Sequence, residues 1–242
     1  MKHDVIIIGG GVSGTALLYT LSKYTNVKNI GLIEKYSEFG LVNSSPTMNS
    51  QILHFGDIET NYTFEKAKKV KLYADMVMHY LEHEKVVKGD EGLFIKVPKM
   101  VLAVGKDQVK TLQDRYPSFS QLFPKLKMIG REEIGKIEPR ILEGRDPDQE
   151  LLALVTEDGY TVDFRKLCDS FANNATKKLE LGEAKILGEK IIFNITPSPG
   201  ASTCLGNAFE DTSRLMEFLS KRFTFDYDQF EKDLVFVLAE CK

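Results

Sequence analysis

Cysteine is scarce in this sequence, with three residues among 242. Cys168, Cys204 and Cys241 are far apart and odd in number, so they show neither a disulfide framework nor metal-ligand spacing. The simple interpretation is a protein of a reducing compartment, in which each cysteine is a small buried hydrophobic residue or an incidental surface thiol. Long apolar runs are also missing, because none reaches the roughly 18 residues that a membrane-spanning helix needs.

A strong charge of either sign is absent too. The net charge of −3, with 43% hydrophobic and 28% charged residues, is ordinary for a globular protein and gives no reason to expect a nucleic acid partner. Residues 1–4 lead straight into an apolar run, which leaves no room for a signal peptide. We therefore expect a cytoplasmic protein, for which a peripheral contact with the inner face of the cytoplasmic membrane stays open.

The stretch from Asp4 to Lys35 has the most informative pattern in the chain. The apolar run at residues 5–8 predicts a buried strand of a parallel sheet, and glycines 9, 11 and 14 follow it in the order G-x-G-x-x-G. Apolar residues at helical spacing then predict a helix that ends at residues 24–26. A second strand is expected at residues 29–33, and Glu34 closes it.

This arrangement is typical of a dinucleotide site. Gly9 allows a tight turn, Gly11 leaves room for the pyrophosphate at the N-terminus of the helix, and Gly14 lets the helix pack closely on the strand. Glu34 would accept hydrogen bonds from the adenosine ribose. The pattern by itself does not distinguish NAD from FAD, and an ordinary glycine-rich turn is the alternative.

The rest of the chain predicts a mixture of helices and strands. A polar loop at residues 43–61 precedes a helix capped by Thr63. The lysines of this helix at 66, 68, 69 and 71 form either a solvated face or a face that contacts an anion or a lipid surface. Further elements are strands at 93–97 and 100–104 joined at Pro98-Lys99, a helix at 108–115 that stops before Pro117, a helical turn at 131–137, a strand at 151–156 with a turn at 157–160, a helix capped by Asp163, a hairpin at 184–195, and helices near 203–222 and 227–238.

Several motifs taken together resemble one known family. They are the fingerprint at residues 4–35, the loop NSSPTMNSQILHFGDIETNYTFEKAKKVK at 43–71, Glu138-Pro139, KLELGE at 178–183 and FNITPSPGAS at 193–202. In these motifs the sequence is similar to the FAD-dependent malate:quinone oxidoreductases, in particular the short ε-proteobacterial type. That family belongs to a wider group of amine and hydroxy-acid oxidases with an FAD-binding Rossmann-like domain.

The resemblance implies an α/β fold with a discontinuous FAD-binding domain, at residues 1–80 and 177–242. Residues 81–176 would form a partial substrate or cap region with a reduced β-sheet. Family members are substantially longer, and a large middle section should separate Phe171 from Leu179, which are eight positions apart here. The resemblance therefore implies a large internal deletion near residues 174–176, of natural or other origin.

The resemblance also assigns the cofactor residues. Gly9, Gly11 and Gly14 would hold the FAD pyrophosphate, and Glu34 the ribose. Ser44 and Ser45 would lie near the phosphates or the ribityl chain. Asn49, Ser50 and Gln51 would approach the isoalloxazine ring, and Gly200, Ala201 and Ser202 its pyrimidine edge, where the dipole of the following helix favours negative charge.

His54 is the candidate catalytic residue. In related hydroxy-acid dehydrogenases a histidine in this loop sits beside the flavin, and an imidazole suits the removal of a hydroxyl proton. A histidine that merely orders the loop is the alternative, and loop capping is the simpler role for Asp57 and Glu59.

The activity that the resemblance implies is oxidation of malate, or a similar 2-hydroxy acid, to the 2-oxo acid, with electrons passed to membrane quinone. A remnant that binds FAD or a partner without turnover is the second hypothesis, because arginines that would clamp the two carboxylates are expected in the absent region. An NAD-dependent dehydrogenase is the third and weakest hypothesis, since the loop from Ser44 to Asn61 has no role in it.

Overall fold

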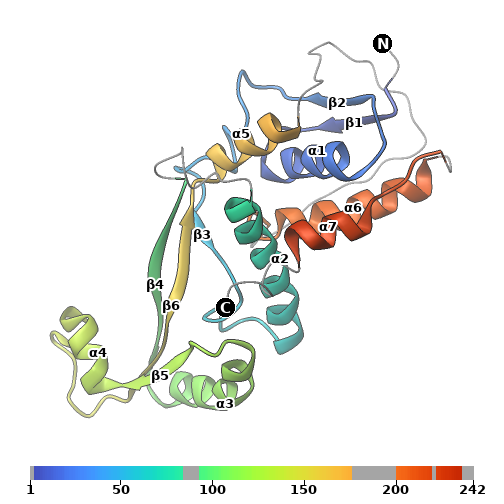
Figure 1. Cartoon of the computed structure of the whole chain (residues 1–242). Helices are drawn as coiled ribbons and strands as arrows, with labels where there is room; N and C mark the ends of the chain where they lie inside the picture. Colours follow the sequence, from blue (N-terminus) through green and yellow to red (C-terminus); the bar gives the residue numbers. More distant parts are fainter. Residues whose placement is uncertain (1–2, 84–92, 176–199, 220–221, 236–242) are drawn as a thin grey trace. The chain divides into compact units, whose positions relative to one another are not determined.

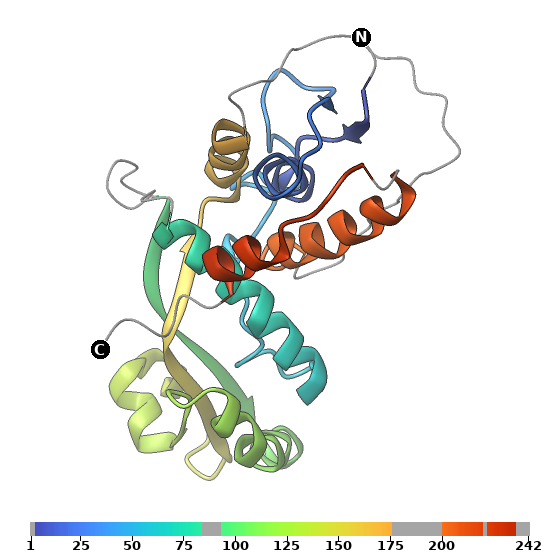
Figure 2. The ribbon, with the colours of Figure 1, turned by 45° about the vertical axis from the view of Figure 1, so that its right-hand side comes forward.

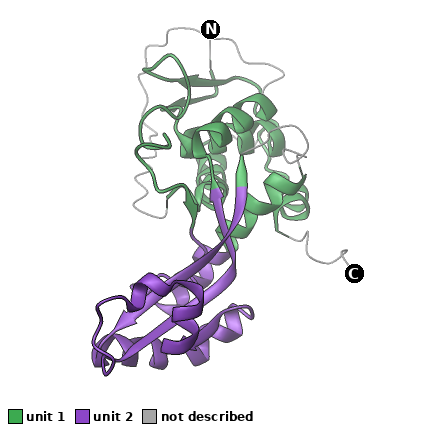
Figure 3. Cartoon of the chain, turned by 90° about the vertical axis from the view of Figure 1, so that its left-hand side faces the viewer, with its two compact units in different colours: residues 1–53, 72–94, 162–242 green, residues 54–71, 95–161 purple. Residues whose placement is uncertain are grey.

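The computed structural model describes residues 3–83, 93–175, 200–219 and 222–235 (Figure 1). The chain divides into two compact units, coloured separately in Figure 3. Unit 1 comprises residues 1–53, 72–94 and 162–242, and unit 2 comprises residues 54–71 and 95–161. These boundaries differ from those of the expected FAD and cap domains, which are functional divisions and remain a prediction. The expected hairpin at 184–195 lies outside the described residues.

Unit 1 begins with the expected strand, helix and strand. Strand β1 (Val5–Ile8) and strand β2 (Ile30–Ile33) pair in parallel, with Val5 opposite Ile30 and Ile8 opposite Ile33. Helix α1 (Val12–Tyr24) connects them. The prediction of a strand buried along its whole length is wrong at its end, because the side chain of Ile8 is 73% exposed.

Helix α1 is the centre of unit 1. It packs against α5 (Phe164–Ala175) on one side and α6 (Cys204–Phe218) on another, and Figure 2 shows it nearly end-on between them. Most of its residues are buried, which is typical of a helix covered on several faces. The ring of Tyr19 lies 5.0 Å from that of Tyr80 on α2 (Phe64–His83), and Tyr80 lies 4.5 Å from Phe171.

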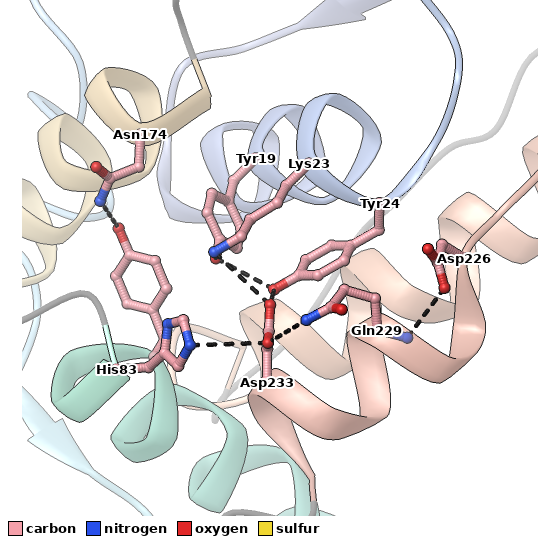
Figure 4. Close-up of polar contacts among 9 residues, drawn as sticks. Tyr19, Lys23, Tyr24, His83, Asn174, Asp226, Gln229 and Asp233 are labelled. Atoms are coloured by element: carbon pink, nitrogen blue, oxygen red, sulfur yellow. Dashed lines mark hydrogen bonds and ion pairs between the residues drawn. The ribbon is translucent and has the colours of Figure 1, made fainter.

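The C-terminal residues are part of this core. Helix α7 (Tyr227–Leu234) lies beside α6, where the rings of Phe209 and Phe230 are 4.9 Å apart. Its Asp233 is 5% exposed and accepts hydrogen bonds from Gln229 (2.6 Å) and from the hydroxyl of Tyr24 on α1 (3.2 Å) (Figure 4). Lys23 on α1 and His83 at the end of α2 also face this carboxylate, at 3.8 and 3.7 Å. Three helices distant in sequence therefore meet at one buried carboxylate.

Unit 2 is built on a small β-sheet. Its elements are β4 (Phe94–Val104), α3 (Lys106–Leu122), β5 (Lys127–Gly130), α4 (Arg131–Ile137), a 3-10 turn (Pro139–Leu142) and β6 (Leu151–Val162). Strand β6 pairs with β4 and, in antiparallel register, with β5. Ile129, Ile134, Leu151 and Ala153 form a hydrophobic core between these elements. Strand β3 (Ile52–Leu53), in unit 1, is the remaining strand of the described residues.

Three of the element boundaries predicted from the sequence are wrong. Strand β4 runs through Pro98, which is tolerated because β4 lies at the edge of the sheet among the described strands. Helix α3 continues past Pro117, where the buried Phe119 keeps the following turn packed. Strand β6 continues through the expected turn at 157–160, because Gly159 lets it approach β4: a Cβ there would lie 2.3 Å from the carbonyl oxygen of Val97.

Other sequence-based predictions are confirmed. Thr63 caps α2 by accepting a hydrogen bond from the N–H of Lys66 (3.2 Å), and Asp163 caps α5 through the N–H groups of Arg165 and Lys166 (3.1 and 3.0 Å). Cys168 and Cys204 are buried, as expected for small hydrophobic residues. Within the described part of the chain, no helix has both the length and the apolar character needed to cross a membrane.

Candidate functional site

The glycine-rich loop joins β1 to α1. Gly9 has a φ of +104°, a conformation that glycine adopts without strain, and its N–H donates to the carbonyl of Ile33 at 2.8 Å. Gly14 is required by packing, since a Cβ at this position would lie 1.9 Å from the carbonyl oxygen of Gly9. The two glycines thus allow the turn and the close contact between the helix and the strand that the sequence predicts.

Gly11 is different, because no protein atom requires a glycine there. Its φ is −73°, and a Cβ would find only the hydroxyl of Ser44, at an ordinary 3.7 Å. Gly11 caps α1 without a side chain, and the first turn of the helix contains no carboxylate. A helix N-terminus without a competing negative charge favours an anion. The contacts within the described protein therefore leave the Cβ position of Gly11 open.

Glu34 follows β2 directly and faces the glycine-rich loop. Its carboxylate accepts hydrogen bonds from the N–H of Gly10 (2.5 Å) and of Tyr36 (3.0 Å). Burial alone would raise the pKa of Glu34, but these backbone donors bring the pKa below its ordinary value. The carboxylate is therefore ionised and fixed beside the loop, on the side where the sequence predicts contact with a ribose.

The polar loop after Glu34 is tied to the start of α1 by Ser44. Its hydroxyl is buried and accepts a hydrogen bond from the N–H of Val12 at 3.0 Å. Ser45 shares a hydrogen bond with Thr47 (3.1 Å), and Asn49 donates to the carbonyl of Asn43 (3.3 Å). The hydroxyl of Ser50 lies 3.5 Å from the N–H of Ile52. Serines 44 and 45 thus stand on an ordered loop beside the helix terminus.

Gln51 is the one non-glycine residue with positive φ (+59°) among the residues described. Its backbone carbonyl accepts from Val162 (2.7 Å), its side-chain oxygen accepts from the N–H of Phe164 (2.9 Å), and its N–H donates to Asn49 (3.0 Å). The Nε2 group is buried, yet has no hydrogen-bond partner in the described structure. A strained backbone and an unsatisfied donor are both costly, and such features concentrate at ligand sites.

The segment before α6 lies against this loop. Gly200 and Ala201 form a turn, and the buried hydroxyl of Ser202 lies 3.5 Å from the carbonyl oxygen of Ile52. Unit 1 thereby brings together two segments that are 150 positions apart, both of which the family resemblance assigns to the isoalloxazine ring. The buried thiol of Cys168 on α5 donates to the carbonyl of Phe164 at 3.0 Å.

His54 belongs to unit 2 and has a partner that the sequence did not reveal. Its Nδ1 lies 2.6 Å from Oε1 of Glu59. In the same loop Asp57 forms a buried ion pair with Lys99 of β4, with Nζ 2.7 Å from Oδ1. Arg115 of α3 donates to the carbonyls of Gly56 (3.3 Å) and Tyr62 (3.2 Å).

Lys99 and Arg115 were not predicted to serve this loop. A lysine beside a proline at the centre of an apolar strand is the only local signal for Lys99. Arg115 lies in a helix whose polar residues are mostly exposed, and nothing in the sequence separates it from them.

Comparison with known proteins places these features in context. A model of the malate:quinone oxidoreductase family matches residues 1–187. The chain is 42% identical over 184 residues to a probable malate:quinone oxidoreductase of Campylobacter jejuni and 36% identical over 181 residues to the malate:quinone oxidoreductase of Helicobacter pylori. Each match covers 73% of this chain and 40% of the relative, so the chain spans well under half of the length of these relatives.

Solved structures agree on the fold. An L-α-glycerophosphate oxidase from Mycoplasma pneumoniae, determined with FAD bound, matches with a TM-score of 0.53 and 24% identity, over 72% of this chain and 43% of that one. A glycine oxidase from Geobacillus kaustophilus matches with a TM-score of 0.54 and 22% identity, over 72% and 45%. The predicted α/β fold is therefore confirmed, over part of the length of FAD-dependent oxidases.

Proposed function

The chain belongs to the malate:quinone oxidoreductase family, and we propose that unit 1 binds FAD at the glycine-rich loop for the oxidation of malate. A similar 2-hydroxy acid is the broader substrate class, the 2-oxo acid is the product, and quinone takes the electrons. Gly11 carries the proposal, because its open Cβ position at a helix terminus without carboxylates leaves room for a pyrophosphate.

The remaining residues fit the same cofactor. Glu34 would exchange part of its backbone contacts for the ribose hydroxyls, and Ser44 and Ser45 would lie along the phosphates. The unsatisfied Nε2 of Gln51 would donate to a carbonyl or ring nitrogen of the isoalloxazine system, which has several acceptors. The turn at 200–202, beside Ile52, would contribute backbone N–H groups at the start of α6.

In the proposed reaction the flavin supplies a two-electron acceptor for the hydride that leaves the hydroxyl-bearing carbon. His54 takes the hydroxyl proton, so that the C–O bond becomes a carbonyl as the hydride leaves. Quinone is soluble in lipid, and for that reason we also propose that the chain contacts the membrane surface peripherally.

The first test is colour. The full chain should purify yellow or take up FAD on reconstitution, giving a flavin absorption band and quenched flavin fluorescence. Gly11→Ala should lower FAD affinity while the circular dichroism spectrum stays unchanged. A folded, colourless chain that FAD does not reconstitute overturns the proposal, and calorimetric binding of NAD in place of FAD would favour an NAD-dependent dehydrogenase instead.

The second test is turnover, measured as malate-driven reduction of a dye or a quinone analogue. It separates the proposed enzyme from a second candidate, a chain that binds FAD without oxidising malate. The short coverage of the relatives favours that second candidate, because 60% of each relative has no counterpart in the match. Flavin reduction by malate in a homogeneous preparation establishes the enzyme, and FAD binding without reduction establishes the second candidate.

A further inference from the structure

His54 and Glu59 form a pair within one loop of unit 2. The distance of 2.6 Å between Nδ1 and Oε1 is that of a strong, charge-assisted hydrogen bond. Both side chains are partly protected from water, with exposures of 28% for His54 and 12% for Glu59. The geometry lies wholly within unit 2.

The groups around the pair keep Glu59 ionised. Burial alone would raise the pKa of Glu59, but the hydrogen bond from His54 and the nearby charge of Lys99 bring it below its ordinary value. Asp57 also faces this region, and its charge is matched by Lys99. Arg115 of α3 adds a second cation that interacts electrostatically with both carboxylates.

The same groups hold the loop in place. Arg115 binds the carbonyls on either side of Glu59, at Gly56 and Tyr62, and its guanidinium lies 3.6 Å from the ring centroid of Phe119. The ion pair between Lys99 and Asp57 fixes a third point, on β4. The loop is therefore anchored on both sides of Glu59, so its carboxylate has a defined position against His54.

An ionised carboxylate only accepts hydrogen bonds, so Nδ1 of His54 must carry the proton. In the neutral imidazole Nε2 is then the basic nitrogen. We propose that Glu59 is a positioning residue, which holds His54 in the tautomer whose Nε2 accepts the hydroxyl proton of the substrate and stabilises the imidazolium that results. The role of His54 rests on the proposed function.

The chemistry balances in one step. The O–H bond of the substrate would break and its proton would form a bond with Nε2, while the hydrogen of the neighbouring C–H bond would leave with both bonding electrons to the acceptor that FAD would supply, and the carbonyl would form. Glu59 remains ionised throughout and transfers no proton. Its contribution is orientation and charge, as for a carboxylate behind a catalytic histidine in other enzymes.

The tautomer is measured by NMR on the full chain labelled with ¹⁵N-histidine, without cofactor or substrate. At a pH where histidine is neutral, His54 should show a protonated Nδ1 and an unprotonated Nε2, with signals assigned from His54→Gln. Glu59→Leu should move His54 toward the Nε2-protonated form. Glu59→Gln retains an acceptor oxygen and should preserve more of the Nδ1-protonated form. Glu65→Gln, an exposed change in the same unit, should leave the spectrum unchanged.

A His54 spectrum that is the same in the wild type and in Glu59→Leu overturns the proposal. If Glu59→Leu does not fold, Glu59→Gln decides. A changed ¹⁵N chemical shift of Nδ1 at the same tautomer ratio supports the pair. No change in either the chemical shift or the tautomer ratio overturns the proposal. The NMR measurement does not require FAD, so its result on the tautomer holds even if the chain neither binds FAD nor oxidises malate.

In a preparation that turns over, Glu59→Gln should lower kcat with little change in KM. The decrease in kcat should be no larger than the contribution of a general base, which is about 10²–10⁴-fold. An unchanged kcat, or an effect on KM alone, contradicts the positioning role.

Discussion

The ammonium group of Lys99 lies 2.7 Å from the carboxylate of Asp57 in an ion pair that water barely reaches, with side chains 4% and 3% exposed. Lys99→Met should destabilise the protein by about 3–5 kcal/mol, because it leaves a buried carboxylate uncompensated. Lys96→Met is the matched control on the same strand: Lys96 is 53% exposed and 3.5 Å from Asp158, so its loss should cost about 1 kcal/mol or less. Urea unfolding at neutral pH measures both.

The destabilisation caused by Lys99→Met should depend on pH, because it comes from the charge of Asp57. Burial already raises the pKa of Asp57, against the opposing charge of Lys99. A raised pKa means that the folded state favours the proton, so stability is present below the ordinary pKa and is lost as pH rises through the folded pKa. Without Lys99 this loss should grow, and the deficit of Lys99→Met should be smaller at pH 4 than at pH 7. A deficit independent of pH would contradict this assignment.

The glycines of the loop should separate by their roles. Gly14→Ala places a Cβ 1.9 Å from the carbonyl oxygen of Gly9 and should cost roughly 1–3 kcal/mol, the usual range for overpacking. Gly11→Ala meets nothing closer than 3.7 Å and should cost less than about 1 kcal/mol, as a change of helix cap. Thermal unfolding of both variants tests the difference. Equal destabilisation would show that Gly11 has a structural role instead.

Glu34 should contribute stability that disappears in acid. Its folded pKa is lowered, so the contribution is present above the ordinary pKa of about 4.3 and is lost as pH falls through the folded value. We expect Glu34→Gln to be about 1 kcal/mol less stable than the wild type at pH 7 and to approach it at pH 3. Glu231→Gln, an exposed change on α7, should follow the wild type at every pH. A difference that persists in acid would exclude the carboxylate charge as the cause.

The buried thiols should be inert in the folded protein. Burial raises the pKa of Cys168 to about 11, and burial also raises the pKa of Cys204. Because the thiolate is the reactive form, neither residue should react with a disulfide reagent at pH 8. In a Cys241→Ser background, the native chain should show no fast thiol and the chain in urea should show two. One fast-reacting thiol in the native chain would mean that α5 or α6 opens readily.

Local pattern predicted the parts of the fold that local forces determine. Gly9, Gly14, Thr63 and Asp163 each satisfy a backbone requirement within a few residues, and the structure places them as expected. Pro98 misled the prediction, because its acceptability depends on whether a strand lies at the edge of a sheet, which is a tertiary property.

Some residues of the candidate site could likewise be predicted from local sequence, and others could not. The glycine-rich loop and Glu34 are read from adjacent residues. The pairing of His54 with Glu59, and the contribution of Lys99 from a strand 42 positions after Asp57, depend on how the loop folds back. No periodicity in the sequence encodes those contacts, so the structure is needed to find them.

Helices α6 and α7 lie beyond the matched residues 1–187 and pack against α1, so we expect them to unfold with α1 as one cooperative unit. Asp233→Ala removes the buried acceptor of Tyr24 and Gln229, so it should cost about 1–3 kcal/mol. Glu231→Ala, two residues away on the exposed side of α7, should cost less than about 0.5 kcal/mol. The urea midpoint of the far-ultraviolet circular dichroism signal measures both. Because α7 meets α1 and α2 at this carboxylate, Asp233→Ala should lower the single midpoint of unit 1, and a loss confined to a separate early transition would show that α6 and α7 fold independently of α1.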